Sequence, residues 1–397
     1  MRQMLDKIGF REHINSCDSL PAQQSNRGYD VSVILESFIT SVWCGATRFL
    51  HTEATRSDKA LAKIFDWQAL PGQDAYKRYF NKFSQSTNQE VSRHFYSWFF
   101  KNIHLNHFTL DIDSTIMTRY GDQQGAMKGY NPSKRGRNSH HPIVAFVNEI
   151  RMVANFWLRS GNSSSANNFI SFLEDTLAMF GEKKVGLIRL DSGFCSGQIM
   201  SYLESTKKNY IVAARFTHPI QRLINSDDAW IGIEQGIQIC DKFYQGADWE
   251  SPRRIVIVRQ RIEERPQAAG RQLSLFAEDE IHRNYRYSAY FTNQECSASD
   301  VWRTYRARGD AENRIKELKD DFGADSFNLK GFFPTEAALH FVMIAYNLMS
   351  LRIFVLREKT QKRLSTLRYR TFAIGAYFEK HGNTLKLKIA LVKKLSL

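Results

Sequence analysis

The chain has 397 residues, 43% of them hydrophobic and 13% aromatic, which is enough to bury a sizeable core in two or three domains and excludes a disordered protein. Its 55 Lys and Arg outnumber its 41 Asp and Glu, and the formal net charge of +14 favours a polyanionic partner such as nucleic acid. The five cysteines stand far apart, with no pair at zinc-ligand spacing, and indicate a reducing, cytoplasmic setting.

A membrane role is not expected. The N-terminus has no uninterrupted apolar run of the secretory type. The most apolar stretch, residues 338–356, is interrupted by His340, Asn347 and Arg352, so it predicts a buried helix rather than a membrane span.

The first hundred residues show apolar residues at three- and four-residue steps, which predicts helices throughout. A helix capped by Ser57, a turn at residues 71–72 and a second, basic helix are compatible with a helix-turn-helix that binds DNA. An ordinary helical hairpin with a solvated basic face explains the same residues equally well. The basic residues are Lys77, Arg78 and Lys82.

A strand is predicted at residues 107–116, where apolar and polar side chains alternate and place Asp111 and Asp113 on one face. Two strands that can pair as a hairpin follow at 141–150 and 151–160. A helix capped by serine at 163–181 then leads to a buried strand that ends near Asp191. This order is typical of a ribonuclease H-like core, whose first and fourth strands are parallel neighbours, so Asp113 and Asp191 should approach each other.

The fold class expected is therefore α/β, with a ribonuclease H-like core that is interrupted by a β-rich insertion and preceded by an all-helical region. The predicted divisions are a helical, candidate DNA-binding region at 1–104, the first part of the core at 105–216, the insertion at 217–292, the second part of the core at 293–356 and a basic C-terminal region at 357–397.

The stretch "YRARGDAENRIKELKDD", residues 305–321, is predicted to be one helix. Five of its residues share one face, at steps of three, four, four and three. A surface of salt bridges would explain their charges, but not the aromatic residue in the same stripe or the aspartates upstream. The five are Tyr305, Arg308, Glu312, Lys316 and Lys319, while Asp310, Glu317, Asp320 and Asp321 fit an ordinary solvated helix.

Three carboxylates from three elements, Asp113, Asp191 and Glu312, are suited to divalent metal ions. Mg²⁺ prefers hard oxygen ligands, and two-metal phosphodiester chemistry needs carboxylates that converge on ions about 4 Å apart. Each residue alone is more often structural than catalytic, so their placement together is the signal.

These residues resemble a known family. The spacing of Tyr305, Arg308, Glu312 and Lys319 matches the Tyr-Arg-Glu-Lys motif of the DDE transposases of bacterial insertion sequences, members of the retroviral-integrase superfamily. "LDIDST" and "RLDSGF", which contain Asp113 and Asp191, resemble the two aspartate motifs of that family, and "AYNL" resembles its following helix. The resemblance extends over nearly the whole chain.

The resemblance implies cleavage at the ends of a mobile element and strand transfer into target DNA, with two Mg²⁺ ions for which Mn²⁺ can substitute. It also implies a homo-oligomer on paired terminal inverted repeats, in the bacterial cytoplasm and associated with the nucleoid. Asp113, Asp191 and Glu312 carry over as catalytic metal ligands, and Tyr305, Arg308 and Lys319 as DNA-contacting residues. The alternatives are a catalytically silent DNA-binding regulator and a nuclease that cuts without joining.

Asp113 is preferred over Asp111 as the first ligand because Ser114 and Thr115 follow it, as in the family's motif. Asp111 is expected to be structural. The loop at 127–141 is basic and leaves the strand beside the predicted metal site, which favours contact with the DNA backbone over a solubilising role. Its basic residues are Lys128, Lys134, Arg135 and Arg137, and its two histidines, His140 and His141, are expected to be structural or DNA-contacting rather than metal ligands.

The pentapeptide "QLSLF" at 272–276 resembles the segment with which bacterial proteins dock on the replication sliding clamp. Gln272, Leu275 and Phe276 would be the anchors. A loop that tucks two apolar residues onto its own subdomain explains the pentapeptide equally well.

Overall fold

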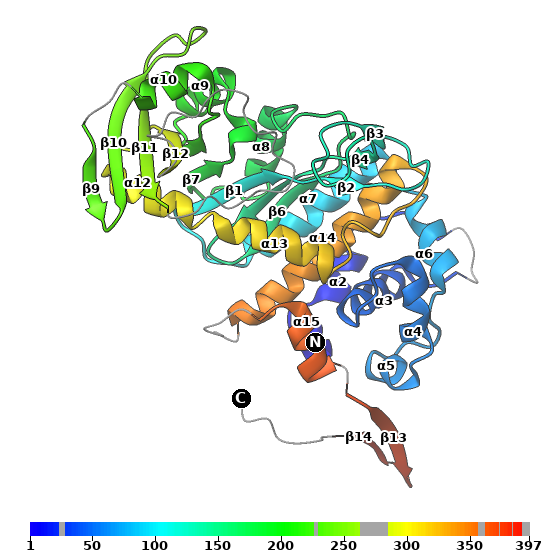
Figure 1. Cartoon of the computed structure of the whole chain (residues 1–397). Coiled ribbons are helices and arrows are strands. Elements are labelled where there is room, and N and C mark those ends of the chain that lie inside the picture. The colour runs from blue at the N-terminus through cyan, green and yellow to red at the C-terminus, as the bar shows by residue number, and fades with distance from the viewer. Residues whose placement is uncertain are drawn as a thin grey trace.

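The computed structural model describes residues 1–23, 28–225, 229–262, 285–355, 362–372, 374–382 and 384–390. At its centre is a nine-stranded mixed sheet with the strand order β6-β5-β1-β7-β8-β12-β11-β10-β9. In Figure 1 the strands of the insertion form one end of the molecule and the N-terminal helices the other. The fold is therefore mixed α/β, as the sequence predicts.

Five strands form the half of the sheet that carries the aspartates. β5 is antiparallel to both β1 and β6, whereas β7 is parallel to both β1 and β8. The prediction that the first and fourth strands of the core are parallel neighbours is confirmed by the pairing of β1 with β7. The bounds are β1 (Phe108–Ser114), β5 (Ile143–Val147), β6 (Met152–Trp157), β7 (Val185–Leu190) and β8 (Tyr210–Ala213).

The strands of the insertion continue this sheet rather than form one of their own, because β12 pairs with β8. The pairing covers an edge that would otherwise expose the backbone N–H and C=O groups of β8. Residues 272–276, with Gln272, Leu275 and Phe276, lie outside the described residues. The bounds are α10 (His218–Asn225), β9 (Ile231–Glu234), β10 (Ile237–Tyr244), β11 (Arg253–Arg261) and β12 (Tyr285–Thr292).

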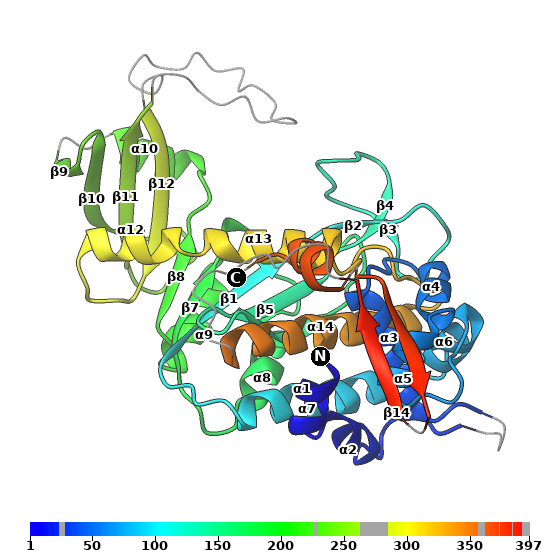
Figure 2. The ribbon, with the colours of Figure 1, turned by 90° about the horizontal axis from the view of Figure 1, so that it is seen from below.

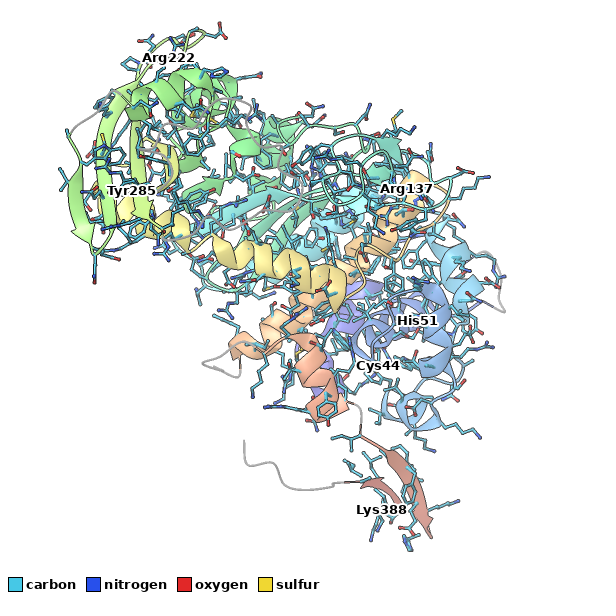
Figure 3. All side chains as sticks on the ribbon, in the orientation of Figure 1. Cys44, His51, Arg137, Arg222, Tyr285 and Lys388 are labelled. Atoms are coloured by element: carbon cyan, nitrogen blue, oxygen red, sulfur yellow. The ribbon has the colours of Figure 1, made fainter. Side chains whose placement is uncertain are left out.

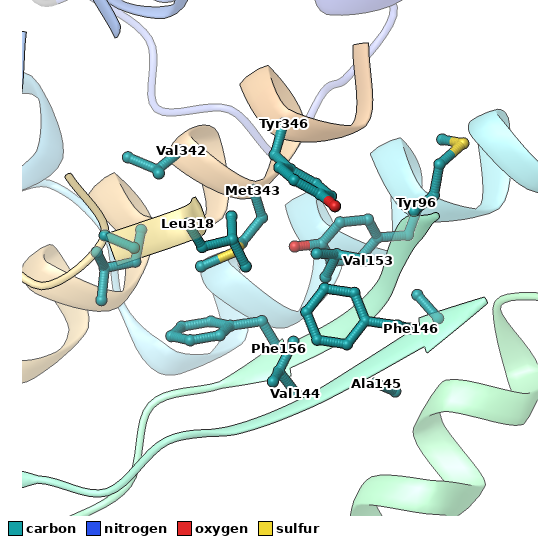
Figure 4. Packing of buried hydrophobic residues seen from close by; sticks show 14 of the residues in the cluster. Tyr96, Val144, Ala145, Phe146, Val153, Phe156, Leu318, Val342, Met343 and Tyr346 are labelled. Atoms are coloured by element: carbon teal, nitrogen blue, oxygen red, sulfur yellow. The ribbon is translucent and has the colours of Figure 1, made fainter. Parts of the chain in front are cut away.

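Helices cover both faces of the β6-β5-β1 region. On one face α8 packs through Phe172, whose ring lies 5.5 Å from that of Trp157. On the other face α13 and α14 bring Leu318 and Met343 against Val144 of β5, next to aromatic side chains (Figure 4). The bounds are α7 (Gln85–Lys101), α8 (Phe169–Ala178), α9 (Gly197–Ser205), α12 (Ala298–Arg306), α13 (Gly309–Asp320) and α14 (Phe332–Val355).

The serine cap predicted for the helix at 163–181 is wrong. α8 begins only after Asn168, which has a left-handed backbone with a φ of 58°, and Ser163–Asn167 form turns before it. Ser165 uses its hydroxyl to contact Ser114 instead. The predicted end is close, because Gly181 follows the helix with a φ of 60°.

The long apolar helix α14 is buried, as predicted. In the described part of the chain it is the one helix long and apolar enough to cross a membrane, but 78% of its most apolar window is buried inside the fold. Three of the N-terminal helices pack on it, namely α3 (Val31–Trp43), α6 (Gln73–Phe80) and α7, and the indole N–H of Trp43 donates to the backbone oxygen of Ala345 at 3.0 Å. The other N-terminal helices are α1 (Arg2–Lys7), α2 (Phe10–Asn15), α4 (Thr52–Arg56) and α5 (Lys59–Ile64).

The predicted cap at Ser57 is also wrong. Asp58 caps α5 by accepting from the backbone N–H groups of Ala60 and Leu61, because Ser57 still terminates α4. In the basic helix α6, Lys77 contacts Gln73 and Asp74 of its own helix, and Lys82 beyond it contacts the backbone oxygen of Ala22.

The C-terminal segment is anchored by two residues of α13 and its end that the sequence assigns to a solvated helix. Glu317 and Asp321 are only 7% and 6% exposed. Glu317 accepts from the N–H of Leu364 at 2.9 Å, and Asp321 accepts from Ser365 and Arg363. Beyond α15 (Leu364–Leu367), the hairpin of β13 (Ala376–His381) and β14 (Thr384–Ile389) lies beside α5 (Figure 2).

Candidate active site

Asp113 lies near the end of the central strand β1 and is 7% exposed. One of its carboxylate oxygens accepts the backbone N–H of Ser114 at 2.8 Å. Asp111 lies two residues earlier on the same face of the strand. The predicted alternation of the strand therefore places both carboxylates beneath the helices α12 and α13.

Asp191 follows β7 directly. Leu190, the last residue of β7, is opposite Ile112 of β1 in the parallel register. The residues that follow them, Asp191 and Asp113, therefore lie side by side. The Asp191 carboxylate caps a short 3₁₀ turn, Ser192–Phe194, by accepting the N–H of Gly193 at 3.1 Å. Arg215 holds the same turn from outside, because its guanidinium donates to the backbone oxygens of Ser192 and Gly193 at 2.8 Å each.

The stretch 305–321 is divided into two helices, so the prediction of one helix is wrong at residues 307–308. At this junction the N–H groups of Arg308 and Ala311 bond three residues back, to Tyr305 and Arg308, at 2.9 and 2.8 Å. Such bonds tighten the backbone into a 3₁₀-like turn, and Gly309 after it is a poor helix former.

Arg308 points inward from this junction and is 4% exposed. Its Nη2 lies 2.9 Å from Oδ2 of Asp113, and its Nη1 lies 3.9 Å from Oε1 of Glu312. The Glu312 side chain is 72% exposed, in the first turn of α13. One guanidinium thus connects the first and third predicted carboxylates.

The other two motif residues also face the ends of the central strands. The Tyr305 hydroxyl donates to the backbone oxygen of Leu190 at 3.2 Å, directly before Asp191. The Lys319 ammonium donates to the backbone oxygen of Ile116 at 2.9 Å, just beyond β1. The face predicted for the helix is therefore turned towards both aspartate segments, although it spans a break.

The pKa of Asp113 is shifted mainly by burial, with smaller effects from neighbouring charges. Burial raises its pKa, Arg308 opposes that rise, and the charges of Asp191 and Glu312 add to it, so that the pKa is raised to about 6. Burial also lowers the pKa of Lys319, against the opposing effect of Asp325. Asp113 therefore lies close enough to Asp191 and Glu312 for their charges to affect its pKa.

The chemistry of these donors fits a divalent cation, because three carboxylates supply hard oxygen ligands whose mutual repulsion a cation would relieve. Their present arrangement is looser than a metal site. Among the residues that the structure describes, no three His, Cys, Asp or Glu side chains are grouped to hold a metal ion. Arg308 is bonded to Asp113, and Glu312 is turned largely to solvent.

Sequence reasoning missed the partner of Asp111. Arg189 of β7 binds both oxygens of Asp111, at 2.6 and 2.7 Å, and both side chains are almost fully buried. The signal was present, because an arginine inside the apolar run 185–190 requires an acidic partner. The expected structural role of Asp111 agrees with this contact.

A polar chain behind the site was also missed. The hydroxyls of Ser114 and Ser165 are 2.8 Å apart, and Ser114 Oγ lies 3.1 Å from Nε2 of His141. His141 Nδ1 lies 2.7 Å from the backbone oxygen of Ser163. Its neighbour His140 lies 3.0 Å from the Nε of Arg119 and 2.9 Å from the backbone oxygen of Gln124.

The basic loop forms a small three-stranded sheet that stands out from the core. Lys134 and Arg137 lie 5.0 and 6.0 Å from the ring centre of Tyr120, which is 70% exposed, and Lys134 also bonds to its hydroxyl. Figure 3 shows Arg137 on this lobe. The strands are β2 (Met117–Thr118), β3 (Met127–Lys128) and β4 (Asn138–His140), and the other basic residues are Lys128 and Arg135.

Comparison with known proteins identifies the family. The chain is a DNA transposase, because residues 1–393 match a family model of transposases. More particularly, it belongs to the family described as "Transposase DDE domain group 1", so the resemblance found in the sequence is confirmed. A DDE transposase is an enzyme that cleaves DNA and transfers the cut strand.

One solved structure to which the chain is similar is a piggyBac transposase in a synaptic complex with hairpin DNA. The TM-score is 0.49 and the sequence identity 12%, over 93% of this chain and 78% of that one. No curated protein matches the chain.

Proposed function

We propose that this transposase cleaves the ends of a bacterial insertion sequence and joins them to target DNA, using a ribonuclease H-like core made of β1, β5, β6, β7 and β8 with their helices. The observation that carries the proposal is the placement of Asp113 and Asp191 at the ends of adjacent parallel strands, with Glu312 reaching the same guanidinium as Asp113. Convergence of three carboxylates from distant segments is what phosphodiester chemistry with metal ions needs.

Asp113, Asp191 and Glu312 would hold two Mg²⁺ ions, with Mn²⁺ as a substitute. When bound, such ions activate the attacking oxygen and stabilise the leaving oxygen. The chain itself positions the ligands: the N–H of Ser114 orients the Asp113 carboxylate, and the turn held by Arg215 orients Asp191. Arg308, from the junction of α12 and α13, lies over Asp113, which is buried.

The DNA would lie across the end of α12, α13 and the basic lobe, where Tyr305, Arg308 and Lys319 would meet phosphates beside the metal ligands. The lobe adds four cations and the exposed ring of Tyr120. The net charge of +14 supports a polyanionic partner. The proposed enzyme acts as a homo-oligomer on paired ends. It is a bacterial cytoplasmic protein that associates with the nucleoid.

The sliding clamp stays a predicted partner. The test is a pull-down of purified clamp by the intact chain and by a Leu275→Ala, Phe276→Ala double variant. Equal capture by both chains would contradict docking through residues 272–276.

The test of the proposed function is a set of single variants, Asp113→Ala, Asp191→Ala and Glu312→Ala, assayed for end cleavage and strand joining with Mg²⁺. The substrate is the DNA on either side of the reading frame that contains inverted repeats. Each variant should lose about a thousandfold in rate, since each removes a ligand of the reacting centre. Asp320→Ala is the matched control, because its side chain is 51% exposed on the same helix.

Three outcomes distinguish the alternatives. Variants that all keep cleavage would show that the site is wrongly assigned. An intact chain that cuts but does not join the ends is a nuclease, and one that binds the ends without cutting them is a regulator.

A further inference from the structure

Arg308 occupies an unusual position for a residue whose family motif implies contact with DNA. Its guanidinium is buried and faces the carboxylates instead of the surface. Burial lowers its pKa, but the charge of Asp113, with further contributions from Tyr305 and Asp191, more than offsets this, and the pKa of Arg308 is raised. The guanidinium of Arg308 is therefore stabilised in its buried position by the proposed metal ligands.

The hold on Arg308 is incomplete. Its closest approach to Asp113 is 2.9 Å, from Nη2 to Oδ2, and its closest approach to Glu312 is 3.9 Å. Its Nη2 reaches the backbone oxygen of Ile112 at 3.4 Å, and its Nε is buried without a hydrogen-bond acceptor. A buried guanidinium with an unmet donor is one that a better acceptor can draw away.

The position of Arg308 in the chain allows such a movement. It lies between α12 and α13, where the helical hydrogen bonds are already shortened to three-residue steps. A change of side-chain rotamer at this junction disturbs neither helix. A phosphate is a strong acceptor for a guanidinium, because it can receive two parallel N–H bonds.

We propose that Arg308 is an internal counter-ion that competes with divalent cations for the carboxylates until DNA draws it to a phosphate. This inference rests on the proposed function of Asp113, Asp191 and Glu312. Metal binding and DNA binding are then coupled, because each requires Arg308 to leave Asp113. The free protein binds divalent ions weakly and is thereby restrained from cutting DNA that it does not hold correctly.

The test is a titration of the full-length chain with Mn²⁺ in the absence of DNA, followed by electron paramagnetic resonance. Arg308→Gln should bind Mn²⁺ at least about tenfold more tightly than the unmodified chain, within the usual range of coupling between sites. Arg306→Gln is the matched control, because Arg306 is exposed, stacks on Trp302 and should leave the affinity unchanged. Adding Asp113→Asn to Arg308→Gln should abolish the gain.

Equal Mn²⁺ affinity in Arg308→Gln and the unmodified chain would overturn the inference. If Arg308→Gln does not fold, a structure of the unmodified chain with Mn²⁺ decides: the guanidinium should have left Asp113. Mn²⁺ bound by Asp113 while Arg308 still lies 2.9 Å away would equally overturn it. Loss of cleavage in the alanine variants without any gain in Arg308→Gln would reject this inference alone, whereas cleavage by those variants would reject the proposed function.

Discussion

Two aspartates on β1, two residues apart, each face an arginine, but the two pairs differ. Asp111 and Arg189 share two short hydrogen bonds of 2.6 and 2.7 Å, with side chains 1% and 2% exposed. Arg189 also donates to the backbone oxygen of Thr304 at 2.5 Å. Asp113 and Arg308 share one ion pair of 2.9 Å, with side chains 11% and 5% exposed.

The two pairs differ because their arginines come from different elements and have different numbers of acidic neighbours. Arg189 lies directly opposite Asp111 on the neighbouring parallel strand, so the pair is fixed by the register of the sheet. Arg308 comes from a junction between helices, and it also feels the charges of Asp191 and Glu312. Asp111 therefore serves to compensate the buried charge of Arg189, whereas Asp113 shares its arginine with other carboxylates and keeps the capacity to bind a ligand.

The largest effect is expected when the Asp111 pair is broken. Asp111→Asn should lower the free energy of unfolding by about 3–5 kcal/mol, because it leaves Arg189 charged and buried without its partner. Urea unfolding measures this. Asp113→Asn is the matched control, and it should cost less stability because Arg308 keeps its attraction to Glu312 and Asp191. A larger loss in Asp113→Asn would contradict the comparison.

Another buried carboxylate, Glu336 on α14, has neutral partners in the N–H of Leu158 and the amide of Asn88. Burial raises its pKa from the usual value of 4.5 to about 7. The folded chain therefore holds this proton more tightly than the unfolded chain, and stability falls as pH rises from 4.5 to 7.

Glu336→Gln removes the charge and keeps one of the two acceptor oxygens, the one that can receive the N–H of Leu158. At pH 8 it should be more stable than the unmodified chain by at most about 3 kcal/mol, and the gain should vanish below pH 4.5. Thermal unfolding between pH 4 and 8 measures it. A gain that does not depend on pH would show that the charge is not its cause.

Asp191 can be displaced without changing any carboxylate. A Cβ at Gly193 would lie 2.6 Å from the Ser165 hydroxyl and 3.1 Å from an oxygen of Asp191. Gly193→Ala should therefore slow DNA cleavage by about tenfold, equivalent to about 1.4 kcal/mol, which is within the usual range for overpacking. A second change, Ser165→Gly, should restore most of the rate, while Gly309→Ala, with open space around it, should be harmless. Failure of the rescue would show that the contact with Ser165 is not responsible.

The smallest effect is expected when both members of the structural pair are replaced together. Asp111→Leu with Arg189→Met removes two buried charges at similar volume, so the stability should stay within about 1 kcal/mol of the unmodified chain. End cleavage should also persist, since neither side chain belongs to the proposed site. Loss of cleavage in a folded double variant would assign Asp111 a role in the reaction.

Local patterns predicted most of what lies within single elements. The alternation at 107–116 placed Asp111 and Asp113 on one strand face, and the apolar run at 338–356 predicted a buried helix. Boundaries were less accurate. Asp58 rather than Ser57 caps α5, and α8 starts only after Asn168, because tertiary contacts of Ser165 compete with the capping role of that serine-rich segment.

The chemical groups of the site and their order can be read from the sequence: two strand-borne aspartates, a glutamate in a charged helical segment and the spacing that resembles the transposase motif. These follow from backbone periodicity, which depends on neighbours in the chain. Three features became apparent from the tertiary structure alone. Asp111 pairs with Arg189, Arg308 points inward to Asp113, and the insertion continues the core sheet. Those outcomes depend on sheet register and helix docking, which bring together residues far apart in the sequence.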